Sequence, residues 1–225
     1  QTPREKYARY VQRGKKLLDR SDTSRALLEY RNAIKEQPNE AEAYHGIALV
    51  FLARNQMREA VASLQRAVEL KPNYSAAQLK LAELMIRTRD EELLKDAEAR
   101  VQKILTDRPG DEDALFTLAA SQAQLGRVED AEKYLNEVLK RSPSDLRSEI
   151  GMALLKVSKG DLAGSEQVLK HALKVHPKSV DALMALSKLY IGMNKLEEGE
   201  ALLRQAISID PENTDPRIAL GALQL

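Results

Sequence analysis

The side chains best suited to metal or proton chemistry in this sequence are its three histidines, His45, His171 and His176. A zinc site needs three or four histidine, cysteine or carboxylate ligands at close spacing, and none of these histidines has such neighbours. His171 and His176 lie five residues apart, which places them on different faces of a helix. Cysteine is absent from the sequence. We therefore expect no metal site and no disulfide.

Motifs of covalent and nucleotide chemistry are also missing from the sequence. It contains no G-x-S-x-G nucleophile motif, no phosphate-binding glycine loop and no dinucleotide fingerprint. Gly160 and Gly164 share a G-x-x-x-G spacing, but their charged context indicates a turn glycine and a close helix contact. We therefore expect no catalytic residue, no cofactor and no enzymatic activity.

Composition narrows the remaining classes of protein. Of the 225 residues, 43% are hydrophobic and 31% are charged, which is typical of a helix-rich soluble protein. The longest apolar run, Ile47 to Ala53, is far shorter than the ~20 residues that cross a bilayer, so no membrane span is predicted. A net charge of +1, no tryptophan and two phenylalanines argue against RNA binding, which needs a basic surface with stacking side chains.

Charge alternates mildly along the chain. Residues 1–40 carry ten Lys or Arg against six Asp or Glu, whereas residues 180–213 carry three against six. Two interpretations stay open: a solvated surface with local ion pairs, or attraction to a charge-matched partner, including self-association through the two ends.

The elements that would position any site are amphipathic helices. Between Glu42 and Pro72, apolar side chains recur every three or four residues in two successive runs. The first run is Tyr44, Ile47, Ala48 and Phe51, and the second is Ala60, Leu64 and Ala67. This pattern predicts two helices joined by a short turn. Because one such pair cannot bury its apolar faces alone, further copies are expected.

A regular spacing of prolines and small residues shows those copies. The prolines are Pro38, Pro72, Pro109, Pro143, Pro177 and Pro211, at intervals of 34, 37, 34, 34 and 34 residues. Five residues before them stand Ala33, Ala67, Ile104, Val138, Ala172 and Ala206, and twelve before them stand Ala26, Ala60, Ala97, Ala131, Ser165 and Gly199. Small residues at the latter position would let one helix approach its neighbour closely.

A 34-residue helix-turn-helix period of this kind resembles the tetratricopeptide repeat (TPR) family. The family carries bulky residues at positions 4, 7 and 11 of the first helix and a small one at position 8, as Leu183, Leu186, Tyr190 and Ser187 do here. The resemblance implies an all-α, right-handed superhelical solenoid of antiparallel helix pairs, with six repeats and a partial seventh. The implied single array over residues 1–225 has repeats at 7–40, 41–74, 75–111, 112–145, 146–179 and 180–213, followed by 214–225.

Some repeats depart from the family pattern. Arg13 replaces an apolar residue in the first repeat, as suits an end repeat, and Glu149 and Lys156 do so in the fifth, the weakest match. The third repeat has three extra residues, placed most economically between Arg87 and Asp96. We expect them to lengthen the helices around the turn by about one turn in total, and the alternative is an insertion in a surface loop.

After the sixth repeat the sequence restarts the first-helix pattern. Thr214 can cap a helix, Pro216 suits its first turn, and Ile218, Leu220, Gly221 and Leu223 follow. This segment is either a terminal capping helix or the start of a further repeat in a longer array. A cap should have a polar outer face, whereas this segment stays apolar to Leu225, so we favour the longer array.

The resemblance also implies where a ligand would bind. In TPR proteins the first helices line a concave face, and positions 2, 5, 6, 9 and 12 tend to contact the ligand. Candidate groove residues are Val11, Lys15, His45, Leu49, Leu79, Lys80, Glu83, Phe116, Ala120, Ile150, Leu154, Met184 and Lys188. No repeat has the lysine at 5 and asparagine at 9 that clamp a C-terminal carboxylate, so that mode is disfavoured. Alternatively, the position-5 side chains simply pack between neighbouring first helices.

We therefore expect a non-catalytic scaffold that holds a peptide or helix of a partner protein in an apolar concave groove. The alternative is an assembly, oligomerisation or positioning segment of a larger multi-domain protein, either an enzyme or a bacterial envelope factor. The array is also similar to bacterial TPR lipoproteins of the cell envelope. This similarity favours the cell envelope or periplasm over the cytoplasm as the compartment.

Overall fold

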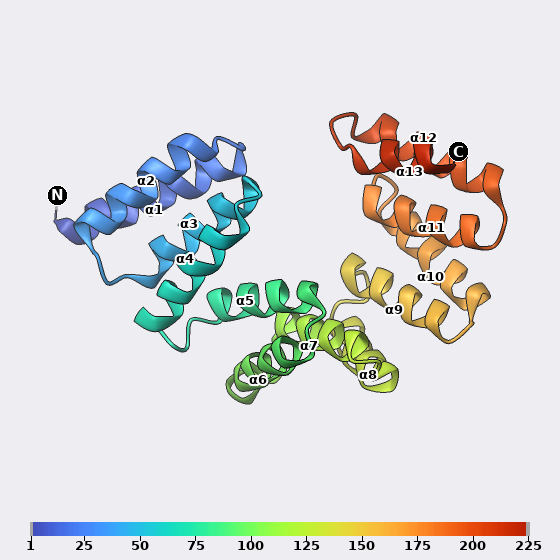
Figure 1. The fold of residues 1–225 in the computed structure, drawn as a ribbon, viewed down its shortest axis with the longest axis horizontal. Helices are drawn as coiled ribbons and strands as arrows, with labels where there is room; N and C mark the ends of the chain where they lie inside the picture. The colour runs from blue at the N-terminus through green and yellow to red at the C-terminus, as the bar shows by residue number, and fades with distance from the viewer. Residues whose placement is uncertain (1, 224–225) are drawn as a thin grey trace. The chain divides into compact units, whose positions relative to one another are not determined.

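The structure is a computed structural model that describes residues 2–223. All regular elements within these residues are α-helices, which confirms the all-α prediction. In chain order they are α1 (Pro3–Asp19), α2 (Thr23–Glu36), α3 (Ala41–Ala53), α4 (Met57–Leu70), α5 (Ser75–Thr88), α6 (Glu91–Asp107), α7 (Glu112–Gln124), α8 (Val128–Arg141), α9 (Leu146–Ser158), α10 (Leu162–Val175), α11 (Val180–Gly192), α12 (Leu196–Ile209) and α13 (Asp215–Leu223) (Figure 1).

The chain divides into two compact bodies. The N-terminal body ends at Thr117 and the C-terminal body begins at Leu118, so α7 spans the division. In the N-terminal body, α1 packs on α2, α3 on α4 and α5 on α6, and each pair contacts the next. In the C-terminal body, α9 packs on α10 and α11 on α12, while α8 contacts α9 and α12 contacts α13. This pattern of contacts is typical of stacked helical hairpins. A single array with the repeat boundaries given above stays a prediction.

The small residues expected to let helices approach closely are all buried. Ala26, Ala60, Ala97, Ala131 and Ser165 are 0% exposed, and Gly199 is also buried. Gly199 shows how close the approach is, since a Cβ added there would lie 2.8 Å from Cγ1 of Ile191. Its carbonyl oxygen accepts a hydrogen bond of 2.8 Å from the Ser187 hydroxyl on the facing helix α11.

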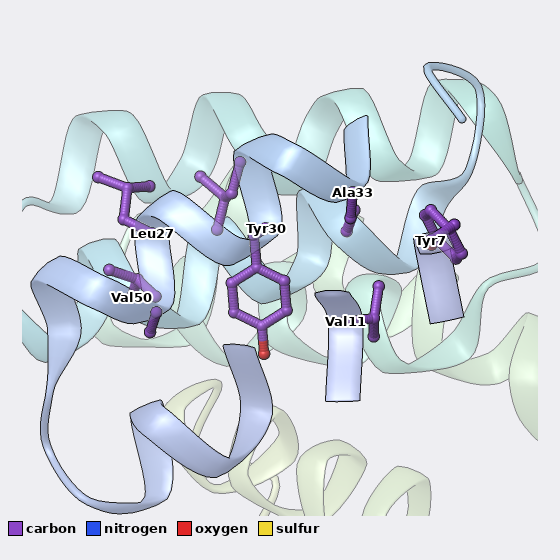
Figure 2. Close-up of a cluster of buried hydrophobic side chains, with 9 residues drawn as sticks. Tyr7, Val11, Leu27, Tyr30, Ala33 and Val50 are labelled. Carbon is purple, nitrogen blue, oxygen red and sulfur yellow. The ribbon is translucent and has the colours of Figure 1, made fainter. Parts of the chain in front are cut away.

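Tyr30 of α2 lies at the centre of the core of the first two helix pairs (Figure 2). It is 3% exposed. Glycines on both flanking first helices make room for its ring: a Cβ added at Gly14 of α1 or Gly46 of α3 would come within 3.0 Å of ring atoms. The core partners of Tyr30 are Tyr7, Val11, Ala26, Leu27, Ala33, Ala43, Ile47 and Val50.

The turn within each helix pair repeats one backbone conformation. One residue in each has a positive φ angle: Ser21, Asn55, Arg89, Gly126, Gly160 and Asn194. Gly160, with φ of +79°, is therefore the turn glycine that the sequence predicted. Side chains with a Cβ disfavour this left-handed conformation, so Arg89, with φ of +59°, carries a cost that Gly160 avoids.

Replacing Arg89 with glycine is therefore expected to stabilise the protein by about 1 kcal/mol, because glycine adopts this conformation without a Cβ clash. The measurement is the urea midpoint of unfolding followed by circular dichroism. Arg87→Gly, within helix α5, is the matched control and should destabilise by about 1 kcal/mol. A loss of stability for Arg89→Gly as large as for Arg87→Gly would contradict this interpretation of the turn.

The extra residues of the third repeat extend its helices, as predicted. Helices α5 and α6 have 14 and 17 residues, compared with 13 and 14 in α3 and α4. Asp90 caps α6 by accepting hydrogen bonds of 3.0 Å from the backbone N–H groups of Glu92 and Leu93. The added four helical residues amount to about one turn.

The other residues that depart from the family pattern differ in their surroundings. Arg13 is exposed, as expected for an end repeat, and Lys156 forms an ion pair of 2.9 Å with Asp161. Glu149 is instead buried, at 4% exposure. The restarted helix is present as α13, with Pro216 buried and Ile218 68% exposed. Leu225, to which the apolar pattern was followed, lies outside the described residues.

Candidate functional site

In the N-terminal body, two of the predicted groove residues belong to the core. Val11 and Leu79 are each 9% exposed, and Val11 packs in the cluster around Tyr30. First helices α1 and α3 contact each other, which accounts for the burial of Val11 between them. Lys15 is exposed, and Leu49 and Phe116 are half-buried. At Val11 and Leu79 the structure therefore favours packing between neighbouring helices over ligand contact.

His45 is held by an aromatic neighbour. Its ring makes an edge-to-face contact with Tyr74 at a centroid distance of 5.5 Å, and Nδ1 lies 3.5 Å from the Tyr74 hydroxyl. Burial, helped by the positive charge of Lys80, lowers the pKa of His45 to about 4. Lys80 also forms an ion pair with Glu83 one turn away. The imidazole is therefore neutral at pH 7, and this part of the surface presents no additional positive charge.

In the C-terminal body the candidate residues are more accessible. Leu154 of α9 is 54% exposed, Lys188 of α11 is exposed, and Ala120, Ile150 and Met184 are half-buried. Ile150 rests on the core cluster of Ala153, Leu169, Leu186 and Leu189. Helices α9 and α11 contact each other. That their candidate residues form one first-helix surface stays a prediction. That the candidates of both bodies line one groove stays a prediction.

No group of three or more His, Cys, Asp or Glu side chains within residues 2–223 could hold a metal ion. Over the same residues, no helix combines the length and apolar character needed to cross a membrane.

Sequence reasoning missed a recurring contact at position 4 of the first helix. In the second repeat the Tyr44 hydroxyl donates a hydrogen bond of 3.1 Å to the carbonyl oxygen of Pro38, six residues earlier. In the third, Nε2 of Gln78 donates one of 3.0 Å to the carbonyl oxygen of Pro72. These bonds tie a first helix to the loop before it. The sequence signal was a polar atom at position 4, six residues after the repeated proline.

Glu149, at position 4 of the fifth repeat, forms a different arrangement. Its Oε1 lies 2.5 Å from Nδ1 of His171 on α10. Its Oε2 is buried and has no hydrogen-bond partner among residues 2–223. The sequence marked Glu149 as a departure from the apolar pattern, but not its burial or its pairing with a residue 22 positions away.

Solved TPR structures share this fold over most of the chain. A structure titled as the functional characterisation of Pseudomonas aeruginosa PilF aligns over 98% of this chain and 99% of that one, with a TM-score of 0.71 and 16% identity. PilW, described as a widely conserved type IV pilus biogenesis factor, aligns over 95% of this chain and 98% of its own, with a TM-score of 0.77 and 18% identity. A TPR protein from Parabacteroides merdae aligns over 97% of this chain and 84% of that one, with a TM-score of 0.82 and 17% identity. At these identities the likeness concerns the fold.

Sequence relatives cover a smaller part. DnaJ homolog subfamily C member 3 of Rattus norvegicus is 30% identical over 105 residues, which are 47% of this chain and 20% of that protein. The human protein of the same description is 29% identical over equal shares. The matched segment is thus about a fifth of these relatives' length.

Two protein families match this chain over most of its length. Residues 2–149 match the TPR domain of cytochrome c-type biogenesis protein H, and residues 156–224 match the tetratricopeptide repeat. TPR proteins are typically non-catalytic scaffolds for protein–protein interaction, with protein or peptide partners. With the helix pairs and their buried small residues, these matches show that the chain belongs to the tetratricopeptide repeat family, and over residues 2–149 to the family of the cytochrome c-type biogenesis protein H TPR domain.

Proposed function

We propose that this chain is a non-catalytic scaffold that binds an apolar segment of a partner protein, helical or extended, on its first-helix surface. The observation that carries the proposal is Leu154, a large apolar side chain that is 54% exposed on a first helix. Burying such a side chain against a partner would contribute about 1 kcal/mol or more of binding free energy. Its half-buried neighbours Ile150 and Met184 extend the apolar surface on α9 and α11.

The basic side chain beside this surface constrains the partner's charge. Lys188 is exposed on α11, and no salt bridge of this side chain is found within the described residues. A carboxylate flanking the apolar segment of the partner would pair with it. Surface ion pairs contribute little to affinity but fix orientation and speed association. The proposed ligand is therefore an apolar segment with an acidic residue beside it.

The matched family description also supports a role in assembly. The family is a TPR domain of a protein named for its role in biogenesis, which supports a partner that is itself being assembled, with the array as the part that positions it. The alternative of oligomerisation through the ends of the array stays a prediction.

The test is peptide selection on the native protein, followed by affinity measurement with designed variants. Peptides displayed as a random library are selected on the native chain, and their affinities are measured by fluorescence anisotropy. Leu154→Glu is expected to weaken selected peptides about tenfold or more, because it places a charge within the apolar contact. The matched control is Leu196→Glu, since Leu196 is 45% exposed on the second helix α12 of the same body.

Selected peptides should be rich in apolar residues, and they should bind the Leu196→Glu variant as well as the native chain. Circular dichroism of both variants confirms the helical fold. Equal weakening by the two variants, or selected peptides that bind Leu154→Glu at native affinity, would contradict the proposed surface.

A further inference from the structure

A pocket on the C-terminal body is lined by residues other than the predicted groove residues. It has a volume of about 330 Å³ and is lined by the end of α8, the following turn, α9 and α10. Its apolar wall consists of Leu139, Met152 and Val168. Glu149 and His171 also line it, and none of the candidate groove residues does. Any ligand here would be recognised independently of the first-helix surface.

Glu149 is an unusual residue for this place in a TPR. The fourth and sixth repeats have Leu115 and Leu183 at the same position, and both are buried. A buried carboxylate is costly unless both of its oxygens accept hydrogen bonds. Glu149 is 4% exposed, and within the part of the chain that the structure describes only Oε1 has a partner, the His171 ring. Oε2 is thus an acceptor that the described residues leave unused, but it is closed to solvent, so a ligand would reach it only once a side chain at the pocket wall turns aside. His171 is the exposed member of the pair, at 57%.

Two other repeats show which group fits against a position-4 side chain. In the third repeat, Nη1 of Arg100 donates a hydrogen bond of 2.8 Å to Oε1 of Gln78. In the second, the Arg66 guanidinium lies over the Tyr44 ring, 5.9 Å from its centroid. Both arginines come from the second helix of their own repeat, so the repeat geometry accommodates a guanidinium here.

The fifth repeat lacks an arginine at either place. Counted back from the proline that ends each repeat, Val168 occupies the place of Arg100, and His171 occupies the place of Arg66. A carboxylate cannot donate to the preceding proline carbonyl as Tyr44 and Gln78 do. The fifth repeat therefore combines an anionic acceptor with an apolar wall where other repeats supply their own guanidinium.

We propose that this pocket binds an arginine side chain of a partner protein. With the His171 side chain turned aside, the guanidinium would donate to Oε2 of Glu149 and to the carbonyl oxygen of Pro143, which also lines the pocket. The alkyl part of the side chain would lie along Leu139, Met152 and Val168. A planar group with several N–H donors suits two divergent acceptors better than a compact ammonium does.

Recognition at this pocket would depend on short-range contacts. Residues 146–179 contain six Lys or Arg against three Asp or Glu, so the surrounding field does not attract a cation. Affinity would come from the buried carboxylate, where a charged hydrogen bond is stronger than at the exposed surface. The position of the pocket makes this proposal independent of the first-helix surface, and either can fail alone.

The test uses the full chain with N-acetyl-arginine amide as the probe, followed by two-dimensional amide NMR. The expected result is saturable shifts centred on the amides of Glu149 and His171. N-acetyl-citrulline amide has nearly the same shape without the charge, and it should bind about tenfold more weakly. Absence of saturable shifts with the arginine probe would overturn the proposal.

Two variants at the carboxylate sharpen the test. Glu149→Leu restores the residue type of Leu115 and Leu183, so it should remain folded, and it should lose arginine binding. Glu149→Gln keeps the shape and should weaken binding about tenfold. The control Glu197→Gln, at an exposed glutamate of α12, should leave binding unchanged. Equal binding by the native chain and Glu149→Leu would also overturn the proposal.

Discussion

Replacing Gly46 with alanine is expected to destabilise the N-terminal body by about 3 kcal/mol, the upper part of the range for overpacked cores. A methyl group at this position would overlap the ring of Tyr30, whose Cδ1 atom would lie 2.7 Å from the new Cβ. Real Cβ atoms do not approach other heavy atoms so closely, so either the ring or helix α3 must move.

Neither movement is easy, because the ring is enclosed on both sides. A Cβ added at Gly14, on α1, would lie 2.9 Å from Cζ of the same ring, so moving Tyr30 away from α3 brings it against α1. Tyr30 is also packed among the side chains shown in Figure 2, including Leu27 and Val50. The ring and the two glycines thus form one close-packed contact across three helices.

The measurement is the free energy of unfolding in urea, with Gly192→Ala as the control. Gly192 is the last residue of α11, and a Cβ there would meet no atom within 4 Å. That change should therefore stabilise by up to about 1 kcal/mol through helix propensity. If the clash with Tyr30 is the cause, Gly46→Ala should cost much less in a Tyr30→Leu background. An equal cost in both backgrounds would contradict the explanation.

Stability should fall by about 3 kcal/mol between pH 6.5 and 4 because of His45 alone. Burial, with a contribution from Lys80, lowers the pKa of His45 from 6.5 to about 4 in the folded protein. Between these values the unfolded chain binds a proton that the folded chain does not, so acid favours unfolding. The loss begins near pH 6.5 and is complete below about pH 4.

The His45→Leu variant isolates this contribution. Leucine is the residue type at position 5 of the third repeat, Leu79, so the substitution suits the site. The free energy of unfolding of both proteins is measured from pH 7.5 to 4, and the native curve should fall more steeply than that of the variant. Lys80→Met should reduce the native slope in part, because Lys80 is the smaller cause of the pKa shift. Parallel curves for the native protein and His45→Leu would contradict the prediction.

The helical hairpins could be predicted from the sequence because close packing leaves a periodic signature. A helix can approach its neighbour closely only where the side chain is small, which explains why Ala26, Ala60 and Ala97 recur and are all buried. The lengthening of α5 and α6 was predictable for a related reason. Ala97 and Ile104 lie twelve and five residues before Pro109, the same spacing as in the other repeats, so the extra residues had to precede Ala97 in the sequence.

The contact around Tyr30, which joins two repeats, left no such signature. The fit of Tyr30 between Gly14 and Gly46 depends on three helices, and each residue alone is compatible with several other arrangements. The candidate groove residues were identified from the family resemblance. The resemblance gives their positions in the first helix, but it does not say whether each side chain is exposed. Val11 is buried because of the particular side chains around it, whereas Leu154 at another candidate position is 54% exposed. Exposure depends on packing partners that periodicity does not specify.

The hydrogen bonds from position 4 to the preceding proline also bear on how the chain unfolds. In a repeat protein, cooperativity comes from the coupling between one repeat and the next. Tyr44 and Gln78 each provide such a coupling, because they fasten a first helix to the loop that ends the repeat before it. In the sixth repeat Leu183 cannot donate such a bond, and in the fifth Glu149 contacts His171 instead. The junctions before α9 and α11 therefore lack this fastening, and the chain is expected to unfold at them before the junctions before α3 and α5 separate.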